Sequence, residues 1–207
     1  MRKFVSKFVW SIVVVLGMTS ATYALDVCNF EGYLNTADLL TDLVGTTPNE
    51  TPTLGIGNGH GGGQCLQAAY NTWASPWWSG TQLVFGGASG QNWTGMTTLT
   101  LWYENLSQAS TIEIMLSDIW GDPFSPKIQT VLKPTPAGDW VKWDIDITGM
   151  TGGYINHMGR IQFAQVYPNY GGGTVLYDDI SVSATPEPAT LVLLSLGGLT
   201  MIRRKRS

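Results

Sequence analysis

Glu104 and Glu113 are the residues that would decide whether this chain cleaves a glycosidic bond. A glycoside hydrolase needs two carboxylates that flank one bond, about 5 to 9.5 Å apart. These two are the mid-domain glutamates, and they lie near the ends of successive predicted strands, outside any recognisable catalytic motif. Hydrolysis is therefore an alternative function that the sequence leaves open.

The two histidines do not predict a metal or nucleophilic centre. His60 has only Cys65 nearby at a metal-ligand spacing, and His157 is isolated, so a zinc site is not expected. The sequence also lacks the Gly-x-Ser-x-Gly elbow of many hydrolases. We expect both histidines to be solvated or simply hydrogen-bonded.

Aromatic residues are the strongest candidates for binding. The chain has nine tryptophans and eight tyrosines, more than a core can readily supply with hydrogen-bond partners. An exposed aromatic ring can stack on the apolar face of a sugar, while nearby amides and carboxylates bind its hydroxyls. The predicted ligand-binding residues are Trp73, Trp77, Trp78, Trp102, Tyr167 and Tyr170. Core packing is the competing interpretation for Trp140 and Trp143, and we prefer it for Trp143.

Two cysteines, Cys28 and Cys65, lie in the part of the chain that we expect to be exported. An oxidising compartment favours a disulfide between them, and closing this loop of about 36 residues would stabilise the fold by roughly 4 kcal/mol. Two unpaired buried thiols are the alternative.

The elements that must position these side chains are strands. Residues 97–103, 111–117 and 140–147 alternate between apolar and polar positions, which is typical of strands with one buried face. Further strands are expected at residues 66–72, 82–85, 127–132, 160–167 and 174–182. Many short strands with little helix predict an all-β fold, an antiparallel β-sandwich of the jelly-roll type.

Two segments before these strands differ in character. Residues 38–44 are the one convincing helical piece, with Asn35 or Thr36 as its cap. Residues 45–64 are rich in glycine but lack the Gly-Lys-Ser/Thr ending of a phosphate-binding loop. We expect a flexible surface loop there.

The order of several short motifs resembles jelly-roll carbohydrate-binding modules. The motifs are residues 29–33 (Asn-Phe-Glu-Gly-Tyr), 91–95 leading into 99–102, 138–140 (Gly-Asp-Trp) and 176–180 (Leu-Tyr-Asp-Asp-Ile). The resemblance covers nearly the whole domain, and it implies a sugar-binding role. It does not indicate which aromatic residues bind.

The same resemblance implies a structural calcium ion. In such modules an early Phe-Glu and an Asp-Asp-Ile in the last strand commonly supply its oxygens, and Glu31, Asp178 and Asp179 are the matching residues. Carboxylates brought together by neighbouring strands repel each other unless a cation neutralises them. Solvated acids at the ends of strands are the alternative.

The N-terminal residues have the pattern of a secretory signal peptide. Arg2, Lys3 and Lys7 precede an apolar stretch, and small residues follow up to Ala24. Cleavage after Ala24 is expected, with Ala21 as a second possible end, so the mature domain spans residues 25–184. It contains four basic and fourteen acidic residues, a formal charge of −10. Nucleic acid is not expected as a partner, because the mature domain has no cluster of Lys and Arg residues that could bind its phosphates.

The C-terminal residues 185–207 combine Pro186, Glu187 and Pro188 with an apolar run and the basic cluster at 203–206. A short membrane helix is expected at residues 189–202, with the basic cluster on the cytoplasmic side. The order of these features resembles the PEP-CTERM sorting signal of Gram-negative bacteria, which implies recognition and cleavage by an exosortase. A plain membrane anchor is the alternative.

Together these patterns predict an exported protein of the cell surface or extracellular matrix. It is anchored in the inner membrane by the C-terminal helix before processing. We expect its sandwich to bind an extracellular polysaccharide without cleaving it. A glycoside hydrolase and a purely structural matrix protein are the two other functions considered.

Overall fold

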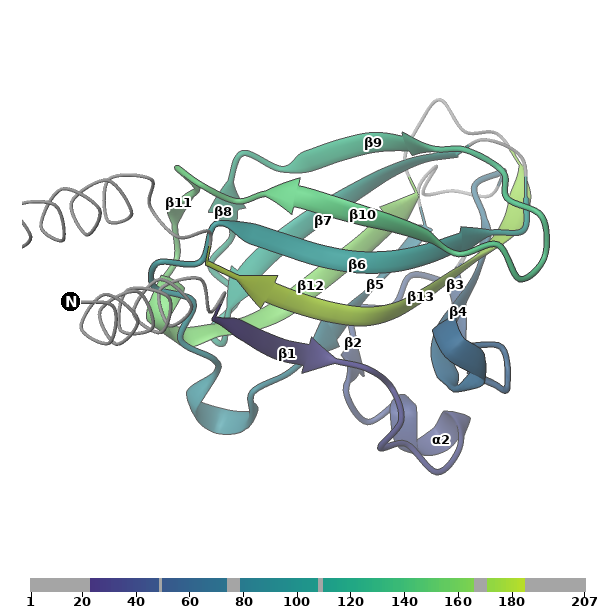
Figure 1. The fold of residues 1–207 in the computed structure, drawn as a ribbon, viewed down its shortest axis with the longest axis horizontal. Helices are drawn as coiled ribbons and strands as arrows, with labels where there is room; N and C mark the ends of the chain where they lie inside the picture. The colour runs from purple at the N-terminus through teal and green to yellow at the C-terminus, as the bar shows by residue number, and fades with distance from the viewer. Residues whose placement is uncertain (1–22, 49, 74–78, 108–109, 166–170, 185–207) are drawn as a thin grey trace, which may run out of the picture. The chain divides into compact units, whose positions relative to one another are not determined.

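The alternating strands fold into antiparallel sheets whose apolar faces pack together (Figure 1). The computed structural model describes residues 23–48, 50–73, 79–107, 110–165 and 171–184. Among these, Leu25–Val182 forms one compact unit. Most of the predicted signal peptide and all of the predicted sorting tail lie outside the described residues.

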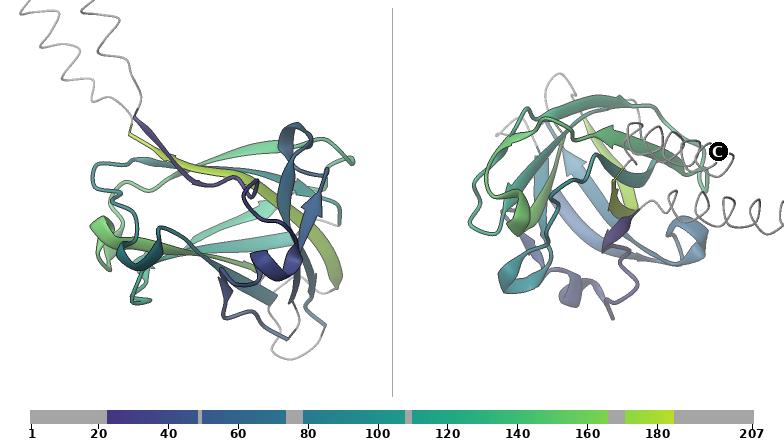
Figure 2. Two further views of the ribbon diagram at one scale, coloured as in Figure 1. Left: turned by 90° about the horizontal axis from the view of Figure 1, so that it is seen from below. Right: turned by 60° about the vertical axis from the view of Figure 1, so that its left-hand side comes forward.

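In the described part of the chain, the first sheet has six strands. Five follow the order β10 (Val141–Asp146), β6 (Thr98–Asn105), β13 (Gly172–Ser183), β4 (Gln64–Asn71) and β3 (Glu50–Ile56). Strand β1 (Ala24–Cys28) also pairs with β13. Figure 2 shows β1, β6, β10 and β13 together in one layer.

The second sheet has five strands within the described ranges. Their order is β2 (Leu43–Val44), β5 (Ser79–Val84), β12 (Met158–Gln165), β7 (Ser110–Asp118) and β9 (Ile128–Leu132). A small ribbon pairs β8 (Phe124–Ser125) with β11 (Thr151–Gly152). The all-β antiparallel fold predicted from the alternating segments is therefore confirmed.

Alternation in each strand decides which side chains enter the core. In β6, Leu99 and Leu101 are fully buried, and Leu101 pairs with Trp143 of β10. Trp143 therefore faces inward as predicted, although it is half-buried because β10 lies at the edge of the sheet. The two sheets meet at stacked rings of Phe163 and Tyr177, whose centroids lie 4.5 Å apart.

The predicted helix at residues 38–44 is shorter and begins earlier. Helix α2 spans Thr36–Leu39, and the predicted cap is confirmed because the Asn35 side chain accepts a hydrogen bond from the amide of Asp38 at 3.1 Å. Leu43 pairs with Leu83 in β5 instead of continuing the helix. Sheet pairing buries Leu43, and this tertiary contact overrides the weak local preference for helix.

The interpretation of residues 45–64 as a flexible surface loop is wrong for its central part. Residues 50–56 form β3, which pairs with β4 through seven residues. Pro52 and Gly55 disguise this strand in the sequence. Proline is tolerated here because β3 lies at the edge of the first sheet, where one side of the strand has no ladder to donate to.

One end of the core is polar. Glu50 of β3 is buried between the sheets, and its carboxylate accepts a hydrogen bond from the hydroxyl of Ser79. Nearby, the side-chain amide of Gln165 donates to the hydroxyl of Tyr177 at 3.1 Å. The hydroxyl of Tyr70 and Oε1 of Gln165 are buried without a hydrogen-bond partner among the described residues. Burial raises the pKa of Glu50 to about 7, although the hydrogen bond from Ser79 opposes this shift.

The raised pKa of Glu50 predicts a pH-dependent stability. The folded state binds this proton more tightly than the unfolded state, so the stabilisation is complete below the ordinary pKa of 4.5 and is lost as the pH rises to about 7. The free energy of unfolding of the wild type should fall by up to about 3 kcal/mol over this pH range, and Glu50→Gln should not show this fall. Urea unfolding of both proteins between pH 4 and pH 8 measures it. Parallel stability curves for wild type and variant would contradict the assignment.

Candidate functional site at the glycine loop

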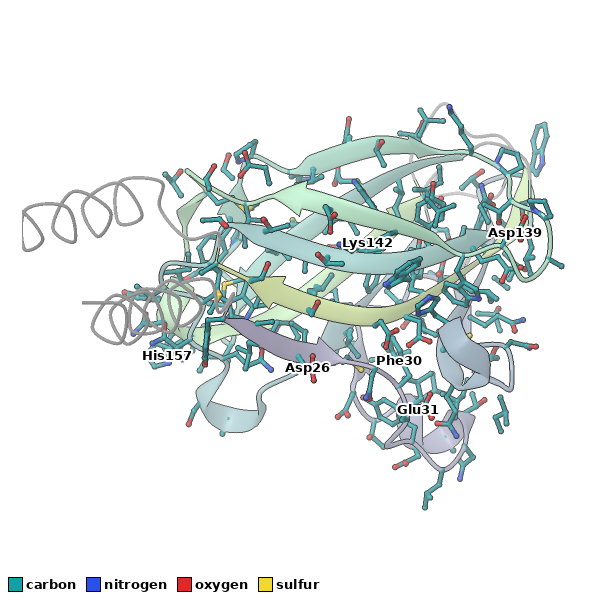
Figure 3. The ribbon with its side chains drawn as sticks, in the orientation of Figure 1. Asp26, Phe30, Glu31, Asp139, Lys142 and His157 are labelled. Carbon is teal, nitrogen blue, oxygen red and sulfur yellow. The ribbon has the colours of Figure 1, made fainter. Side chains whose placement is uncertain are left out.

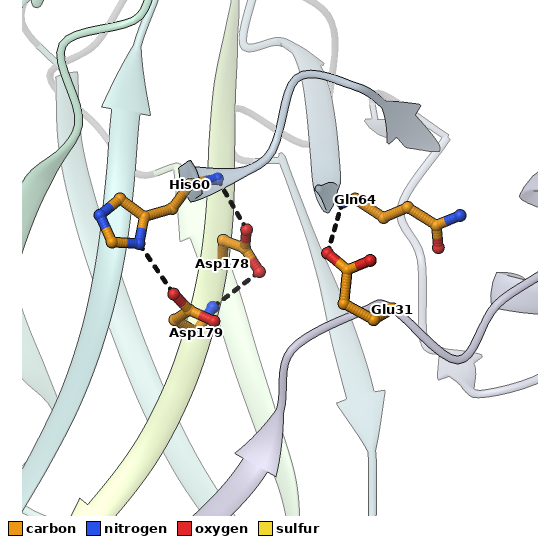
Figure 4. Close-up of polar contacts among 5 residues, drawn as sticks. All are labelled: Glu31, His60, Gln64, Asp178 and Asp179. Carbon is orange, nitrogen blue, oxygen red and sulfur yellow. Dashed lines mark hydrogen bonds and ion pairs between the residues drawn. The ribbon is translucent and has the colours of Figure 1, made fainter. Parts of the chain in front are cut away.

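The site is built around the loop that joins β3 to β4, residues 57–63, which we call the glycine loop. Asp178 of β13 accepts a hydrogen bond from the amide of His60 at 2.8 Å (Figure 4). Glu31 accepts one from the amide of Gln64 at 2.7 Å (Figure 4). Two carboxylates from opposite ends of the mature chain therefore hold this loop against the outer face of the first sheet.

Glycine is required in this loop because the carboxylates approach its backbone closely. A Cβ atom on Gly59 would lie 2.5 Å from the carbonyl oxygen of Gln64 and 2.8 Å from Oδ2 of Asp178, and one on Gly63 would collide with the carboxylate of Glu31. Gly61, with a φ of +80°, occupies the left-handed region that glycine enters without strain. The glycine-rich composition thus marks a loop bound by carboxylates.

A break in β13 lets two adjacent carboxylates reach the loop. Tyr177 and Ile180 are both buried, so strict alternation fails at Asp178 and Asp179 between them. Asp179 has a φ of +45°, a conformation that a non-glycine residue adopts only when its surroundings enforce it. Oδ1 of Asp178 accepts the amide of Asp179 at 2.7 Å, which stabilises this backbone.

His60 links the loop to two tryptophans. Its Nδ1 lies 2.8 Å from Oδ2 of Asp179, and its ring stacks on Trp102 with centroids 3.9 Å apart and planes 15° apart. The ring of Trp140 approaches His60 edge-on at 6.1 Å. His60 is therefore hydrogen-bonded, as the sequence predicts, and it covers one face of Trp102.

A pocket of about 400 Å³ opens beside the glycine loop, within the range of about 300 to 1,000 Å³ typical of small-molecule sites. Its lining combines an indole, side-chain amides, a carboxylate, two leucines and bare backbone. The lining residues are Gly57, Asn58, Gly59, Gly61, Gly62, Gln67, Glu104, Leu106, Ala137, Gly138, Trp140 and Leu176. This mixture suits a ligand with both apolar faces and hydroxyl groups.

Glu104 joins the two walls of the pocket. It is buried at the end of β6, and its Oε1 accepts the amide of Gly138 at 2.8 Å. The bond fixes the segment between β9 and β10 that carries Trp140. Figure 3 shows Asp139, from the same segment, at the end of the strands where β6 finishes.

The carboxylates at the loop also affect one another. Burial raises the pKa of Asp178 to about 6, and the negative charges of Asp179 and Glu31 raise it further against the two amide hydrogen bonds. The three predicted calcium ligands therefore meet at one loop, where each accepts at least one hydrogen bond. In the part of the chain that the structure describes, no three His, Cys, Asp or Glu side chains form a group that could hold a metal ion.

The sequence-predicted aromatic ligands do not form one platform among the described residues. Trp73 follows β4 and is 69% exposed, whereas Trp102 lies under His60. Trp77, Trp78, Tyr167 and Tyr170 lie outside the described residues. Trp140, for which core packing was the competing interpretation, lines the pocket, and the Gly-Asp-Trp motif that contains it was the available signal.

The two mid-domain glutamates cannot act as a catalytic pair. Glu104 lines the pocket on the outer face of the first sheet, whereas Glu113 lies in β7 of the second sheet. There it contacts Lys127 at 2.8 Å and the side chain of Gln129 at 2.7 Å. Residues on the outer faces of opposite sheets cannot flank one bond at the spacing that hydrolysis needs.

The predicted disulfide is absent, because Cys28 and Cys65 are both free. The thiol of Cys65 is buried and points to the carbonyl of Gly55 at 3.7 Å. Burial raises the pKa of Cys65 to about 12 and that of Cys28 to about 11. Thiols held in their protonated form are poor nucleophiles, so the alternative interpretation of two unpaired thiols holds.

Comparison with protein families identifies the C-terminal segment. A family model for the PEP-CTERM protein-sorting motif matches residues 184–206. The chain carries this sorting motif, which indicates an exported protein that an exosortase sorts at the membrane. A search of curated protein sequences finds no match.

Several solved structures share the fold. The family 11 carbohydrate-binding module from Clostridium thermocellum, in complex with a β-1,3-1,4-mixed-linked tetrasaccharide, has a TM-score of 0.58 and 14% identity and covers 81% of this chain and 99% of that chain. An exo-β-agarase has a TM-score of 0.59 and 12% identity, and the match covers 78% of this chain and 25% of the agarase chain. An arabinose-bound α-L-arabinofuranosidase has a TM-score of 0.57 and 14% identity, and the match covers 79% of this chain and 27% of the enzyme chain.

The chain therefore shares the β-sandwich fold of a carbohydrate-binding module and of parts of two enzymes. At such low identity these likenesses show the fold alone, and this chain spans only about a quarter of the two enzymes. Among the residues that the structure describes, no helix is long and apolar enough to cross a bilayer. The membrane helix predicted at residues 189–202 lies outside them.

The two unpaired cysteines, of which Cys65 is buried and Cys28 is partly exposed, give a direct prediction. Exported protein, denatured without reductant, should show two reactive thiols per chain, because neither thiol is engaged in a disulfide. The native protein should react far more slowly, since burial keeps both thiols protonated. A thiol-reactive dye measures both quantities, and a reduced sample is the control. If the denatured, unreduced protein shows no reactive thiol, the two cysteines form a disulfide and the prediction is wrong.

Proposed function

We propose that the mature domain is an exported module that binds extracellular polysaccharide without cleaving it. The pocket beside the glycine loop carries this proposal. Trp140 supplies an apolar ring surface, and Gln67 and Asn58 supply amide groups for hydroxyls. The carbohydrate-binding-module fold and the sorting motif support the same function independently.

The pocket is held in shape before any ligand arrives. Asp178 and Glu31 fix one wall through the glycine loop. Glu104 fixes the other through the amide of Gly138. Because little conformational entropy remains to be lost, a rigid site of this kind can bind a flexible glycan whose own contacts are weak.

The carboxylates of the pocket support binding without cleavage. Glu104 is the one acidic residue among the described residues that line it, and it is already hydrogen-bonded to the backbone. Hydrolysis requires a second carboxylate across the scissile bond, and Glu113 lies on the other sheet. A glycoside hydrolase that uses this pair is therefore not the function we propose.

The charge of the domain favours a particular class of glycan. With a formal charge of −10 on the mature chain, an anionic polymer would be repelled unless cations lay between. A neutral polysaccharide is the expected ligand. Affinity should lie in the micromolar to millimolar range, because each hydroxyl exchanges water for protein at small net gain.

Trp140→Ala tests the pocket. If a sugar covers about 60 Å² of the indole, its loss costs about 1.5 kcal/mol, or about tenfold in Kd. Affinity electrophoresis and calorimetry against mixed-linked β-glucan, agarose and alginate measure the change.

Trp73→Ala is the matched control, since it removes an exposed tryptophan that does not line the pocket. If binding survives Trp140→Ala but is lost in Trp73→Ala, the loop aromatics predicted from the sequence bind the polysaccharide, and the pocket does not. If no polysaccharide retards the wild type, the structural matrix protein becomes the better description. Reducing-sugar release from any of the three polymers would instead favour a hydrolase.

Structural calcium at Glu31, Asp178 and Asp179 stays a prediction of the sequence. An ion bound only by the folded state adds about 2.7 kcal/mol at a hundredfold excess over its Kd, so excess chelator should lower the melting temperature. Asp179→Ala should abolish this response, and Asp26→Ala, an exposed acid on β1, should keep it. An unchanged melting temperature in chelator would mean that hydrogen bonds alone hold the loop.

A further inference from the structure

An exposed group of aromatic rings lies away from the pocket, between the β7–β8 connection and the short 3-10 helix Ile155–His157. It consists of Trp120, Tyr154 and His157, and we call it the aromatic corner. Trp120 is 60% exposed and Tyr154 is 58% exposed. Their ring centroids lie 5.4 Å apart at 75°, and the ring of His157 lies 5.3 Å from that of Trp120 at 65°.

One buried carboxylate fixes the backbone on both sides of this corner. Asp118, at the end of β7, is fully buried. Its Oδ1 accepts the amides of Trp120 at 2.9 Å and Asp122 at 3.0 Å, and its Oδ2 accepts the amide of Tyr154 at 3.1 Å. Burying a carboxylate is costly unless it is hydrogen-bonded, and here its bonds position the two exposed rings.

Further contacts hold the turn that carries Trp120. The guanidinium of Arg160 donates to the carbonyl of Ile119 at 3.1 Å, and the amide of Ile119 donates to the carbonyl of His157 at 3.0 Å. Gly121 has a φ of +92° and lies close to the Arg160 guanidinium. The indole of Trp120 thus projects from a fixed turn.

His157 supplies a polar group beside the rings. Its Nδ1 lies 3.0 Å from the carbonyl of Ser89. A carbonyl can only accept, so Nδ1 donates, and Nε2 of the neutral ring is then an acceptor. Asp122 and Asn156 nearby are exposed. The corner therefore combines two preorganised rings with hydrogen-bonding groups.

We infer that the aromatic corner is a second carbohydrate-binding site, which takes the apolar face of a neutral sugar ring. The inference rests on the proposed function, because the ligand is the same class of polysaccharide. Two rings at 75° offer one stacking surface and one edge, a shape that fits a single sugar unit. Exposed polar residues surround the rings, which suits a ligand covered with hydroxyls.

The corner and the pocket lie at opposite ends of the strands. The pocket lies where β6 ends, and the chain then enters β7, which runs nine residues to Asp118. At about 3.3 Å per residue this strand spans roughly 27 Å. Figure 3 shows His157 and Asp139 correspondingly far apart. One molecule can therefore hold two separate glycan segments and cross-link a matrix.

Trp120→Ala and Trp140→Ala, each in the full exported chain, test this inference. The probes are the mixed-linked β-glucan tetrasaccharide and the intact polymer. Calorimetry with the tetrasaccharide should give two sites per wild-type chain and one in either variant, because a weak site whose Kd rises about tenfold is no longer detected at the same concentrations. Affinity for the polymer should fall more than tenfold in each single variant, because the avidity of two linked sites is lost.

Three outcomes separate this inference from the proposed function. One site per chain in the wild type, with Trp120→Ala unchanged, would overturn the aromatic corner and leave the pocket standing. Tyr154→Ala provides a second variant at the corner, and loss of one site in it would support the inference even if Trp120→Ala fails to fold. No binding of tetrasaccharide or polymer by the wild type, nor of agarose, would overturn both.

Discussion

The hydrogen bonds between two carboxylates and the backbone of the glycine loop determine the geometry of the pocket. Glu31, near the start of the mature chain, and Asp178, in its last strand, hold residues 57–63 against the first sheet. The pocket exists because this loop stands beside the segment that Glu104 fixes. Any substitution that adds a Cβ atom at Gly59 or Gly63 would push the loop away from these acids.

Buried acids have structural roles in several parts of this domain. Asp178 orders the glycine loop, Glu104 orders the segment before β10, and Asp118 orders the aromatic corner. Each accepts backbone amides that would otherwise be unpaired in turns, and an unpaired buried donor costs about 1 to 3 kcal/mol. The acidic composition of the domain is thus partly a consequence of how its loops are held.

The core and the candidate binding groups occupy different parts of this domain. The apolar faces of the two sheets meet through residues such as Phe163 and Tyr177, and the ends of the strands carry the candidate binding groups. Loops at the ends of a sandwich vary without disturbing its core. The likeness in fold to a sugar-binding module and to parts of two enzymes, at 12–14% identity, is consistent with such variation.

The sequence by itself determined the class of fold, because alternation at residues 97–103, 111–117 and 140–147 depends only on one-sided burial. It also determined the sorting motif, which is a linear signal.

Only the tertiary structure decided the rest. Strand β3 was hidden by Pro52, which is tolerated because the strand lies at the edge of the sheet, and by Gly55, where a Cβ atom would lie 2.7 Å from the thiol of Cys65. No local pattern in the sequence reveals either constraint. Cys28 of β1 and Cys65 of β4 belong to the same sheet, yet both thiols are free. Trp120 and Tyr154 are separated by 34 positions in the chain. They become neighbours through the amide hydrogen bonds that both donate to Asp118 and through the backbone hydrogen bond between Ile119 and His157, because a contact between distant residues is set by packing.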